Sequence, residues 1–320
     1  MAQKHDTIPY QKQGEVIKNN SFIRCSNNLT TVQRKSFAIM LKEAFDAIQT
    51  TGQKDFYSMP LTEYKKLMGH PDSMPAKYIA AELEELMTKL IKWDIDEEGY
   101  GNRATMLSSF ALKKGTGKLE WEFSKMLLSK LTADGYTPLK LSIVLDFNSK
   151  YSLALYENLQ MRKEFKKTSF ELAEFRALMG VEPHEHKQMT HFKTKVLHAA
   201  IDEINAKSDM RITYKDIKAG AKITGFSFAW ELLSSEQLKT RNKRREQIEG
   251  YQKALAANFG NKFKIGGKWY TLTKQGFINR GKILGGFDIV DSYEAFKTLE
   301  KQGLVTERKG HPQASLFPPT

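Results

Sequence analysis

The chain has 320 residues, and 40% of them are hydrophobic, which is enough for two domains that each bury a core. No window approaches 18 consecutive apolar residues, and the polar N-terminus lacks the apolar stretch of a secretion signal, so we expect a cytoplasmic protein without membrane contact. A single cysteine, Cys25, leaves no material for an internal disulfide, a cysteine zinc cluster or a CxxC redox pair, and we interpret it as a packing residue.

The net charge of +13, with a pI near 9.5, favours a polyanionic partner. The excess is uneven along the chain. Residues 234–320 hold 16 Lys and Arg against 8 Asp and Glu, so the last quarter supplies +8 of the total.

In chain order, residues 1–20 are predicted to be a polar arm. The first helical pattern begins at Thr30, which fits a capping box with Gln33, and its apolar residues recur at helical spacing up to Gly52.

A short helix is predicted over 60–68, ended by Gly69, and a longer one follows the turn at 70–75. The apolar face of this third helix comprises Ile79, Leu83, Leu86 and Leu90. Two β-type runs, Met106–Leu112 and Lys118–Phe123, close the unit around a tight turn. Three helices and a hairpin are the element order of a winged helix, which we assign to residues 21–131.

The same unit occurs a second time. Six residues of the short helix reappear 111 positions later: Leu61, Glu63, Tyr64, Leu67, Met68 and Gly69 correspond to Leu172, Glu174, Phe175, Leu178, Met179 and Gly180. A second set recurs at a spacing of 114: Tyr78, Leu83, Met87 and Leu90 correspond to Phe192, Leu197, Ile201 and Ile204. We therefore predict a duplicated domain.

The second winged helix is assigned to residues 149–233, after a mixed connector at 132–148. Its predicted helices are Ser149–Met161, Ser169–Met179 and Met189–Lys207, and its predicted strands are Arg211–Ile217 and Lys222–Phe228. The fold class is thus α+β, two tandem winged helices with a small C-terminal appendage.

The appendage, residues 234–308, is predicted to be α+β. It contains a basic helix over 235–257, a Gly-Gly turn at 266–267 between short β-type runs, and a helix near 293–301. The tail at 309–320 has no periodicity and is predicted to be disordered.

In a helix-turn-helix unit the third helix enters the major groove and presents its N-terminal, outward residues to base edges. For the second unit these are Gln188, Thr190, His191, Thr194 and Lys195, with Lys187 and Lys193 placed for phosphates. The core-facing residues are Phe192, Val196, Leu197, Ala200 and Ile201. The equivalent set of the first unit is Ser73, Met74, Ala76 and Lys77, which has fewer donors and so predicts positioning more than sequence reading.

Lysines occupy the tips of both predicted hairpins: Lys113, Lys114 and Lys118 in one, Lys218 and Lys222 in the other. These positions suit a neighbouring phosphate or minor groove. Five more cations crowd the appended helix: Lys239, Arg241, Lys243, Arg244 and Arg245. For both groups the alternative that they are solvent-exposed lysines and arginines without a partner stays open.

Three patterns that resemble catalytic motifs fail. Gly276–Lys282 spells GxxxxGK, but Ile283 follows where a phosphate-binding loop needs Ser or Thr for magnesium. His184 and His186 flank an acidic residue in a Pro-adjacent loop, unlike the two histidines around an apolar residue on a strand of a nickase. Glu84, Glu85 and Asp94–Glu98 form acidic patches without a partnering His. We predict no enzyme, no metal and no cofactor.

The second unit contains a characteristic set of residues: Phe192-Lys193, Val196-Leu197, Ala200-Ile201, Glu203-Ile204-Asn205, Asp209, Ile212, Tyr214, Lys218, Gly220, Lys222 and Phe226-x-Phe228. This set resembles the signature of iteron-binding plasmid replication initiators. Matches in the first unit are Leu29-Thr30 with Gln33-Arg34-Lys35, and the start of the second unit adds Ser149-Lys150-Tyr151 and Leu155-Tyr156. The resemblance covers residues 21–230.

This resemblance implies a bacterial, plasmid-encoded protein whose monomers bind direct repeats of duplex DNA at the plasmid origin, so that melting and helicase loading begin. It also implies homodimers that repress the protein's own gene, formed through the first winged helix and the connector, and contact with host initiator and helicase proteins. The competing hypotheses are an origin-nicking enzyme or ATPase, and a plain winged-helix repressor.

The tail contains Gln313, Leu316 and Phe317, which resemble the Gln-x-x-Leu-Phe peptide that bacterial replication proteins insert into the sliding clamp. A disordered segment can fold onto a groove with two adjacent apolar anchors, so we expect clamp binding. An inert terminal tail is the alternative.

Overall fold

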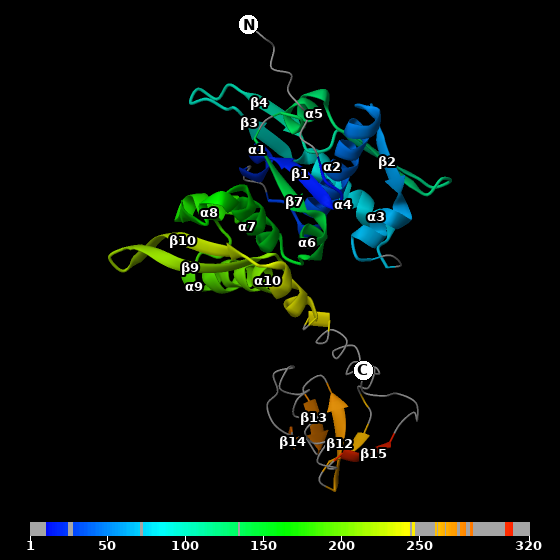
Figure 1. Cartoon of the computed structure of the whole chain (residues 1–320), viewed down its shortest axis with the longest axis vertical. Coiled ribbons are helices and arrows are strands. Elements are labelled where there is room, and N and C mark those ends of the chain that lie inside the picture. Colours follow the sequence, from blue (N-terminus) through cyan, green and yellow to red (C-terminus); the bar gives the residue numbers. More distant parts are fainter. Residues whose placement is uncertain are drawn as a thin grey trace. The chain divides into compact units, whose positions relative to one another are not determined.

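The structure is a computed structural model. It describes residues 11–24, 28–70, 73–133, 135–243, 245–246, 260, 262–265, 267–273, 276–279, 282–283 and 305–309. The chain divides into two compact units between Leu232 and Leu233. Figure 1 shows the helices and strands of both units.

Two winged helices make up the first unit. The first domain comprises β1 (Glu15–Asn19), α1 (Asn20–Arg24), α2 (Thr31–Thr51), β2 (Tyr57–Pro60), α3 (Leu61–Leu67), α4 (Ala76–Thr88), β3 (Leu90–Trp93), β4 (Asn102–Thr105), β5 (Ser109–Lys113), β6 (Lys118–Glu122) and α5 (Lys125–Leu131). After β7 (Tyr136–Lys140) and α6 (Leu141–Asp146) the second domain comprises α7 (Lys150–Met161), a 3₁₀ turn (Lys163–Phe165), β8 (Lys167–Glu171), α8 (Leu172–Leu178), α9 (Met189–Phe192), the π-helical η2 (Lys193–His198), α10 (Ala199–Lys207), β9 (Met210–Ala219) and β10 (Lys222–Leu232).

The duplication is visible in the sheets. In the first domain the strand order is β2-β6-β5, and in the second it is β8-β10-β9. In each case a short strand ahead of the second helix pairs antiparallel with the second strand of the wing. The predicted tandem winged-helix fold is confirmed.

The repeated sextet packs identically in its two copies. Tyr64 and Phe175 are 0% and 1% exposed, so each anchors a seven-residue helix in its domain core. Gly69 and Gly180 then have positive φ angles of 79° and 63°, the left-handed conformation with which helices commonly end. The predicted helix stop at Gly69 is confirmed, and its duplicated counterpart Gly180 has the same conformation.

The long helices α2 and α7 are the most deeply buried helices of the two domains. The capping box of α2 is present: Gln33 N donates to Thr30 Oγ1 at 3.1 Å, and Thr30 N donates to Gln33 Oε1 at 3.1 Å. Residues 33–41 of α2 and 152–160 of α7 are buried without interruption, which is the pattern of a helix surrounded on all sides.

Buried polar contacts join the two domains. Lys18 Nζ donates to Glu157 Oε1 of α7 at 2.5 Å, and the two side chains are only 5% and 3% exposed. Because burial penalises the ammonium, it lowers the pKa of Lys18, although Glu157 opposes this effect. A second buried group lies nearby in the second domain, where Asp209 accepts hydrogen bonds from Tyr156 and Gln160.

Some predicted elements need correction. Leu90 was expected on the buried face of the third helix, but α4 ends at Thr88 and Leu90 is 47% exposed in β3. The hairpin β3–β4, which carries the acidic run 94–98 at its turn, was not predicted and has no counterpart in the second domain, where β9 begins three residues after α10. Residues 169–171, expected in a helix, belong to β8.

The polar arm and the connector also differ from expectation, since both contain strand. Glu15–Asn19 of the arm pairs antiparallel with Tyr136–Lys140 of the connector, in a register that places Ile17 opposite Pro138. Val16 and Ile17 are completely buried, so this part of the arm belongs to the core of the first unit.

The second unit contains an antiparallel sheet. Its strands are β11 (Lys262–Ile265), β12 (Lys268–Thr273), β13 (Gly276–Asn279), β14 (Lys282–Ile283) and β15 (Val305–Lys309), in the order β14-β13-β12-β11-β15. β11 and β12 flank the predicted Gly-Gly turn, of which Gly267 is described. Lys309, assigned to the tail, ends β15.

Residues 235–243 are helical, as predicted for the start of the basic helix, and Ser234 and Gln237 form a capping box ahead of it. The rest of that predicted helix beyond 246, the helix near 293–301 and the tail beyond Lys309 lie outside the described residues.

Candidate nucleic-acid interface

One arginine organises the loop that leads into the third helix of the second domain. Arg176 of α8 donates to the carbonyl oxygens of Glu182, Glu185 and His186 at 3.3, 2.6 and 3.3 Å. Its guanidinium carbon also lies 4.8 Å from the centroid of the Phe192 ring. Because Phe192 is fully buried, this arginine fixes where the helix starts relative to the loop.

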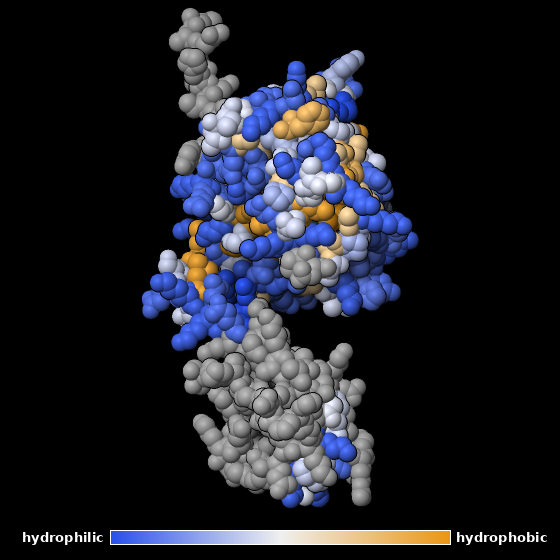
Figure 2. All heavy atoms as spheres, turned by 90° about the vertical axis from the view of Figure 1, so that its right-hand side faces the viewer, coloured by the Kyte–Doolittle hydropathy of each residue, from blue (hydrophilic) through white to orange (hydrophobic). Residues whose placement is uncertain are grey.

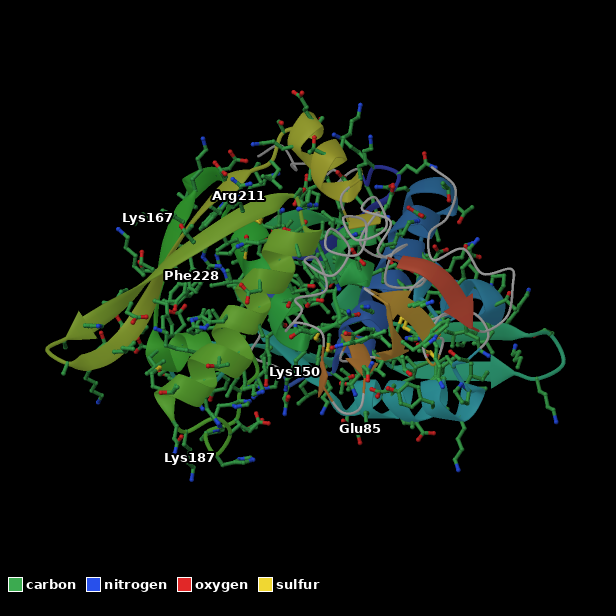
Figure 3. The ribbon with its side chains drawn as sticks, turned by 90° about the horizontal axis from the view of Figure 1, so that it is seen from below. Glu85, Lys150, Lys167, Lys187, Arg211 and Phe228 are labelled. Atoms are coloured by element: carbon green, nitrogen blue, oxygen red, sulfur yellow. The ribbon has the colours of Figure 1, made fainter. Side chains whose placement is uncertain are left out.

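The predicted reading residues lie on the exposed side of this helix. Lys187, Gln188, Thr190, His191, Thr194 and Lys195 are all exposed, and Figure 3 shows Lys187 at the periphery of the domain. The opposite side is the core: Phe192, Val196, Leu197 and Ala200 are fully buried and Ile201 is 7% exposed. The division into core and outward faces agrees with the prediction.

A π-helical turn interrupts the reading helix at Lys193–His198. Since a π turn closes with i→i+5 hydrogen bonds, it holds one residue more than an α turn and shifts the following residues around the axis. The spacing of the buried residues shows this shift. In α4 the buried residues are Ile79, Leu83 and Leu86, and their counterparts in the second domain are Phe192, Leu197 and Ala200. The first two buried residues are four positions apart in α4 but five positions apart in the second domain. The sequence repeat paired Phe192 with Tyr78, which is exposed. The buried counterpart of Phe192 is the next residue, Ile79, so that pairing was wrong by one position.

Beside the helix, β9 and β10 form a long wing. Lys218 and Lys222 are exposed around its turn, as predicted. Phe228 lies on the side of the sheet that faces the helices, whereas Lys167 and Arg211 lie on the side that faces away from them (Figure 3).

Lys193, predicted for a phosphate, is engaged inside the domain. Its Nζ donates to both carboxylate oxygens of Asp216 on β9 at 3.0 Å and lies 5.3 Å from the centroid of the Tyr214 ring. Burial acts against the ammonium, but the hydrogen bonds to Asp216 and the proximity of Tyr214 outweigh it and raise the pKa of Lys193.

The first domain presents fewer candidate contacts. Ser73 and Lys77 are exposed at the start of α4, but Met74, which was grouped with them, is buried at 6% exposure and belongs to the core. On the first wing Lys114 and Lys118 are exposed, while Lys113 Nζ lies 2.6 Å from Glu120 Oε2.

The appended cations are described in part. Arg241 and Arg245 are half-buried on the helix that starts at Ser235, while Lys239 and Lys243 are exposed. Arg244 lies outside the described residues, as do Gln313, Leu316 and Phe317.

Reasoning from sequence missed three residues that shape this face, Arg176, His198 and Asp216, and it gave Tyr214 only as a signature residue without a role at this face. His198 Nε2 and Tyr214 Oη are 2.7 Å apart, one turn along the helix from the Lys193–Asp216 pair. A signal for Asp216 was present, because it is an isolated acidic residue among the lysines of the wing, two positions from Tyr214 and thus on the same side of the strand.

Two family models match this chain over consecutive segments. The model described as Initiator Replication protein, WH1, matches residues 15–160, and the model described as Initiator Rep protein, WH2, matches residues 171–230. The chain belongs to the initiator replication protein family. The WH1 match includes β1, β7 and most of α7 of this initiator.

Among solved structures, the crystal structure of Pi initiator protein in complex with iteron DNA superposes on this initiator with a TM-score of 0.56. The sequences are 15% identical, and the match covers 71% of this chain and all of that one, which supports the shared fold. Domains 2 and 3 of RctB give a TM-score of 0.40 at 11% identity over 63% of this chain and 83% of that one, too low to establish a common fold. No curated protein matches the chain.

Several residues that carry the family signature have structural roles in the initiator. The side chain of Asn205 forms two hydrogen bonds with the backbone of Ile212. Ile212 N donates to Asn205 Oδ1 at 2.6 Å, and Asn205 Nδ2 donates to Ile212 O at 3.0 Å. Glu203 accepts from the backbone amides of Asn148 and Ser149 at 2.7 and 3.1 Å, which ties α10 to the start of α7. These residues hold the reading helix against the rest of its domain.

Two of the sequence patterns that resemble catalytic motifs can be located in the structure. The GxxxxGK stretch leads from β13 into the antiparallel β14, whereas a phosphate-binding loop leads from a strand into a helix. His184 is exposed and His186 half-buried on the loop before α9, and no group of three His, Cys, Asp or Glu side chains in the described part could hold a metal ion.

The visible surface of the first unit is mainly hydrophilic. Figure 2 shows one face with scattered small hydrophobic areas among blue, polar ones. Within the described part of the chain, no helix combines the length and the apolar character needed to cross a membrane.

Proposed function

We propose that this initiator binds direct repeats (iterons) of double-stranded DNA at the origin of a bacterial plasmid and thereby starts replication. One observation carries the proposal: two winged helices in tandem, the second of which presents six exposed polar or basic residues on and immediately before its reading helix, beside a wing with lysines at its turn. The fold shared with Pi initiator protein, solved in complex with iteron DNA, supports it.

In this proposal the second domain reads sequence. Gln188, Thr190, His191, Thr194 and Lys195 carry the hydrogen-bonding groups that distinguish base edges in the major groove, and Lys187 binds phosphate. Lys218 and Lys222 of the wing, together with Ser73, Lys77, Lys114 and Lys118 of the first domain, supply backbone contacts. Lys113 and the appended Arg241, Arg244 and Arg245 would add charge.

Footprinting tests the proposal. Two winged helices on successive major-groove faces should protect about 20 bp, two turns of roughly 10.5 bp, at each repeat beside the gene. A coding segment of equal length is the control. Protection over one turn only, or equal protection of the control, would contradict tandem docking.

A winged-helix repressor would give the same footprint, so replication itself must be measured. A plasmid that carries only the protected repeats and a marker should replicate in a bacterial host when the protein is supplied in trans. Loss of the repeats should abolish replication of the plasmid. Repression of a reporter without any support of replication would favour the repressor instead.

Self-association is the second part of the proposal. We infer that dimers form through the first winged helix and residues 132–148, because the reading helix of the second domain must remain free for DNA. Dimers would bind an inverted repeat and repress the initiator's own gene. A fragment of residues 149–233 should be monomeric in sedimentation at concentrations where the full chain dimerises; equal dimerisation would contradict this assignment.

The remaining partners are host replication proteins. A non-enzymatic initiator must recruit other proteins for melting and unwinding, and we propose that host initiator and helicase bind it in the bacterial cytoplasm. We also propose that Gln313, Leu316 and Phe317 bind the sliding clamp with a Kd in the micromolar range, about 8 kcal/mol. Calorimetric titration of the clamp with the full chain should show this binding, and the double substitution Leu316→Ala with Phe317→Ala should abolish it.

A further inference from the structure

Two polar contacts tie the reading helix to the wing in the second domain. Lys193 binds Asp216 through both carboxylate oxygens, and His198 meets Tyr214 at 2.7 Å. The two helix residues are the first and last of the π turn, and the two strand residues lie on the same side of β9 because strand side chains alternate. The reading helix and β9 are thus joined at both ends of the π turn.

The Lys193–Asp216 pair lies close to an irregularity in the pairing of the wing strands. Asp216 is opposite Phe226, and the register of β9 and β10 becomes irregular immediately beyond, between Ile223 and Gly225. An irregularity of this kind bends a strand pair and increases its twist. Lys218 and Lys222 lie beyond this irregularity. Their position relative to the reading helix therefore depends on the Lys193–Asp216 contact, which is the nearer to the turn of the two polar contacts between helix and wing.

The contrast with the first domain is sharp. In the part of the chain that the structure describes, we find no side-chain hydrogen bond or ion pair between α4 and the strands β5 and β6. Lys113 of the first wing pairs instead with Glu120 across its own hairpin. The tie between helix and wing is therefore a feature of the domain that presents the reading residues.

We propose that Lys193 and Asp216 are positioning residues for DNA recognition, which fix the wing tip with Lys218 and Lys222 at a set distance from Thr194 and Lys195. The proposal rests on the proposed DNA binding. It differs from a phosphate contact by Lys193 in a way that can be measured. A carboxylate beside DNA repels phosphate, so its removal strengthens binding if it acts only through charge, and weakens binding if it holds the wing in place.

The experiment measures fluorescence anisotropy of the full chain on a fluorescent duplex of the footprinted repeat and on a shuffled duplex of the same composition, across salt concentrations. The proteins are the parent, Lys193→Ala, Asp216→Ala, the double variant, and Lys222→Ala as the control for a phosphate contact. Failure of the parent to prefer the repeat would count against the proposed function itself, and only a parent that prefers it allows the variants to be judged.

We expect Lys193→Ala and Asp216→Ala each to weaken binding to the repeat by about tenfold, a coupling of about 1.4 kcal/mol. The double variant should be no weaker than either single one, since all three break the same contact. Lys193→Ala should keep the parent's slope of log affinity against log salt, whereas Lys222→Ala should lower that slope by roughly one. Thermal unfolding of each variant shows whether the fold is retained.

The exchanged pair Lys193→Asp with Asp216→Lys provides the second test, because it keeps an ion pair while it moves the cation from helix to wing. It should recover most of the parent's preference for the repeat. A lower salt slope for Lys193→Ala, binding by Asp216→Ala as tight as the parent's or tighter, or an exchanged pair as weak as Lys193→Ala would each overturn the proposal.

Discussion

Individual side chains of the family signature act in this initiator mainly by holding backbone segments together. Asn205 satisfies both the amide and the carbonyl of Ile212, and Glu203 accepts from two amides at the start of α7. These two signature residues are thus distinct from the exposed residues that would read DNA, whereas Lys218 and Lys222, also in the signature, are proposed to contact the DNA backbone.

Replacement of Asn205 by Ala should destabilise the second domain. It leaves the backbone amide and carbonyl of Ile212, which is 2% exposed, without their partner, and each such group costs about 1 to 3 kcal/mol, so we expect a loss of about 2 to 6 kcal/mol. Urea unfolding measures it. Asp202→Ala, at an exposed position of the same helix, is the control and should change stability by no more than about 0.5 kcal/mol.

The stabilisation by Glu203 should depend on pH. Burial works against the charge of Glu203, but hydrogen bonds from Lys207 Nζ and the Asn148 amide hold the pKa of Glu203 below the ordinary 4.5. Because the pKa is lower in the folded state, the contribution is complete above the unfolded value and is lost as the pH falls through the folded one.

Glu203→Gln should therefore be less stable than the parent at pH 7, by about 1 to 2 kcal/mol for the loss of a charged hydrogen bond. The difference should shrink as the pH falls below about 4.5. Urea unfolding at several pH values tests this, with Glu84→Gln at an exposed site of α4 as the control. A difference that is constant between pH 7 and pH 3 would contradict the role of the charge.

At the scale of elements, the two wings differ in how their sheets are built. In the second domain β10 approaches β8 so closely at Gly225 that a Cβ atom there would lie 2.4 Å from the backbone oxygen of Phe170. Glycine is required because the obstacle is backbone and cannot rotate away. In the first wing Gly115 lies in the turn, with open space around its own Cβ position.

Gly225→Ala should accordingly destabilise the initiator by about 1 to 3 kcal/mol, since the β8–β10 pairing must open to admit the methyl group. Gly115→Ala should be within about 0.5 kcal/mol of the parent. Denaturant unfolding of both variants gives the comparison. Equal stabilities would show that the sheet yields at Gly225 without cost.

For the molecule as a whole, the two winged helices form one compact unit and the appended residues form another. Lys18 and Glu157, 139 positions apart, are paired in the interior of the first unit. If either partner is removed, the other charge stays buried without compensation, and this destabilises the folded unit. The residues proposed to read DNA all belong to this first unit.

Removal of residues 233–320 should therefore preserve the footprint while it weakens binding to all duplexes. The removed part carries +8, and the salt slope falls by roughly one for every phosphate that the shortened chain no longer binds. Titrations of the shortened and full chains on repeat and shuffled duplexes measure both effects. An unchanged slope would show that the appended cations do not bind DNA, and absence of the footprint would place sequence reading in the appended unit.

The sequence by itself determined the features whose causes lie within a few residues. The Thr30–Gln33 capping box, the helix stops at Gly69 and Gly180, and the core side of the reading helix all follow from local hydrogen bonds, backbone conformation and helical spacing. The duplicated sextet added the tandem architecture, because equal residue patterns bury equal faces.

Only the tertiary structure decided the contacts between distant segments. The strands β2, β7 and β8 are four or five residues long and exist through pairing with distant strands, and the exposed position of Leu90 follows from a hairpin with no periodic signal. Lys193 looked like a free cation because its partner lies 23 residues away, and the π turn around it is visible only in the folded helix. Such contacts depend on how elements pack, which spacing along the chain does not encode.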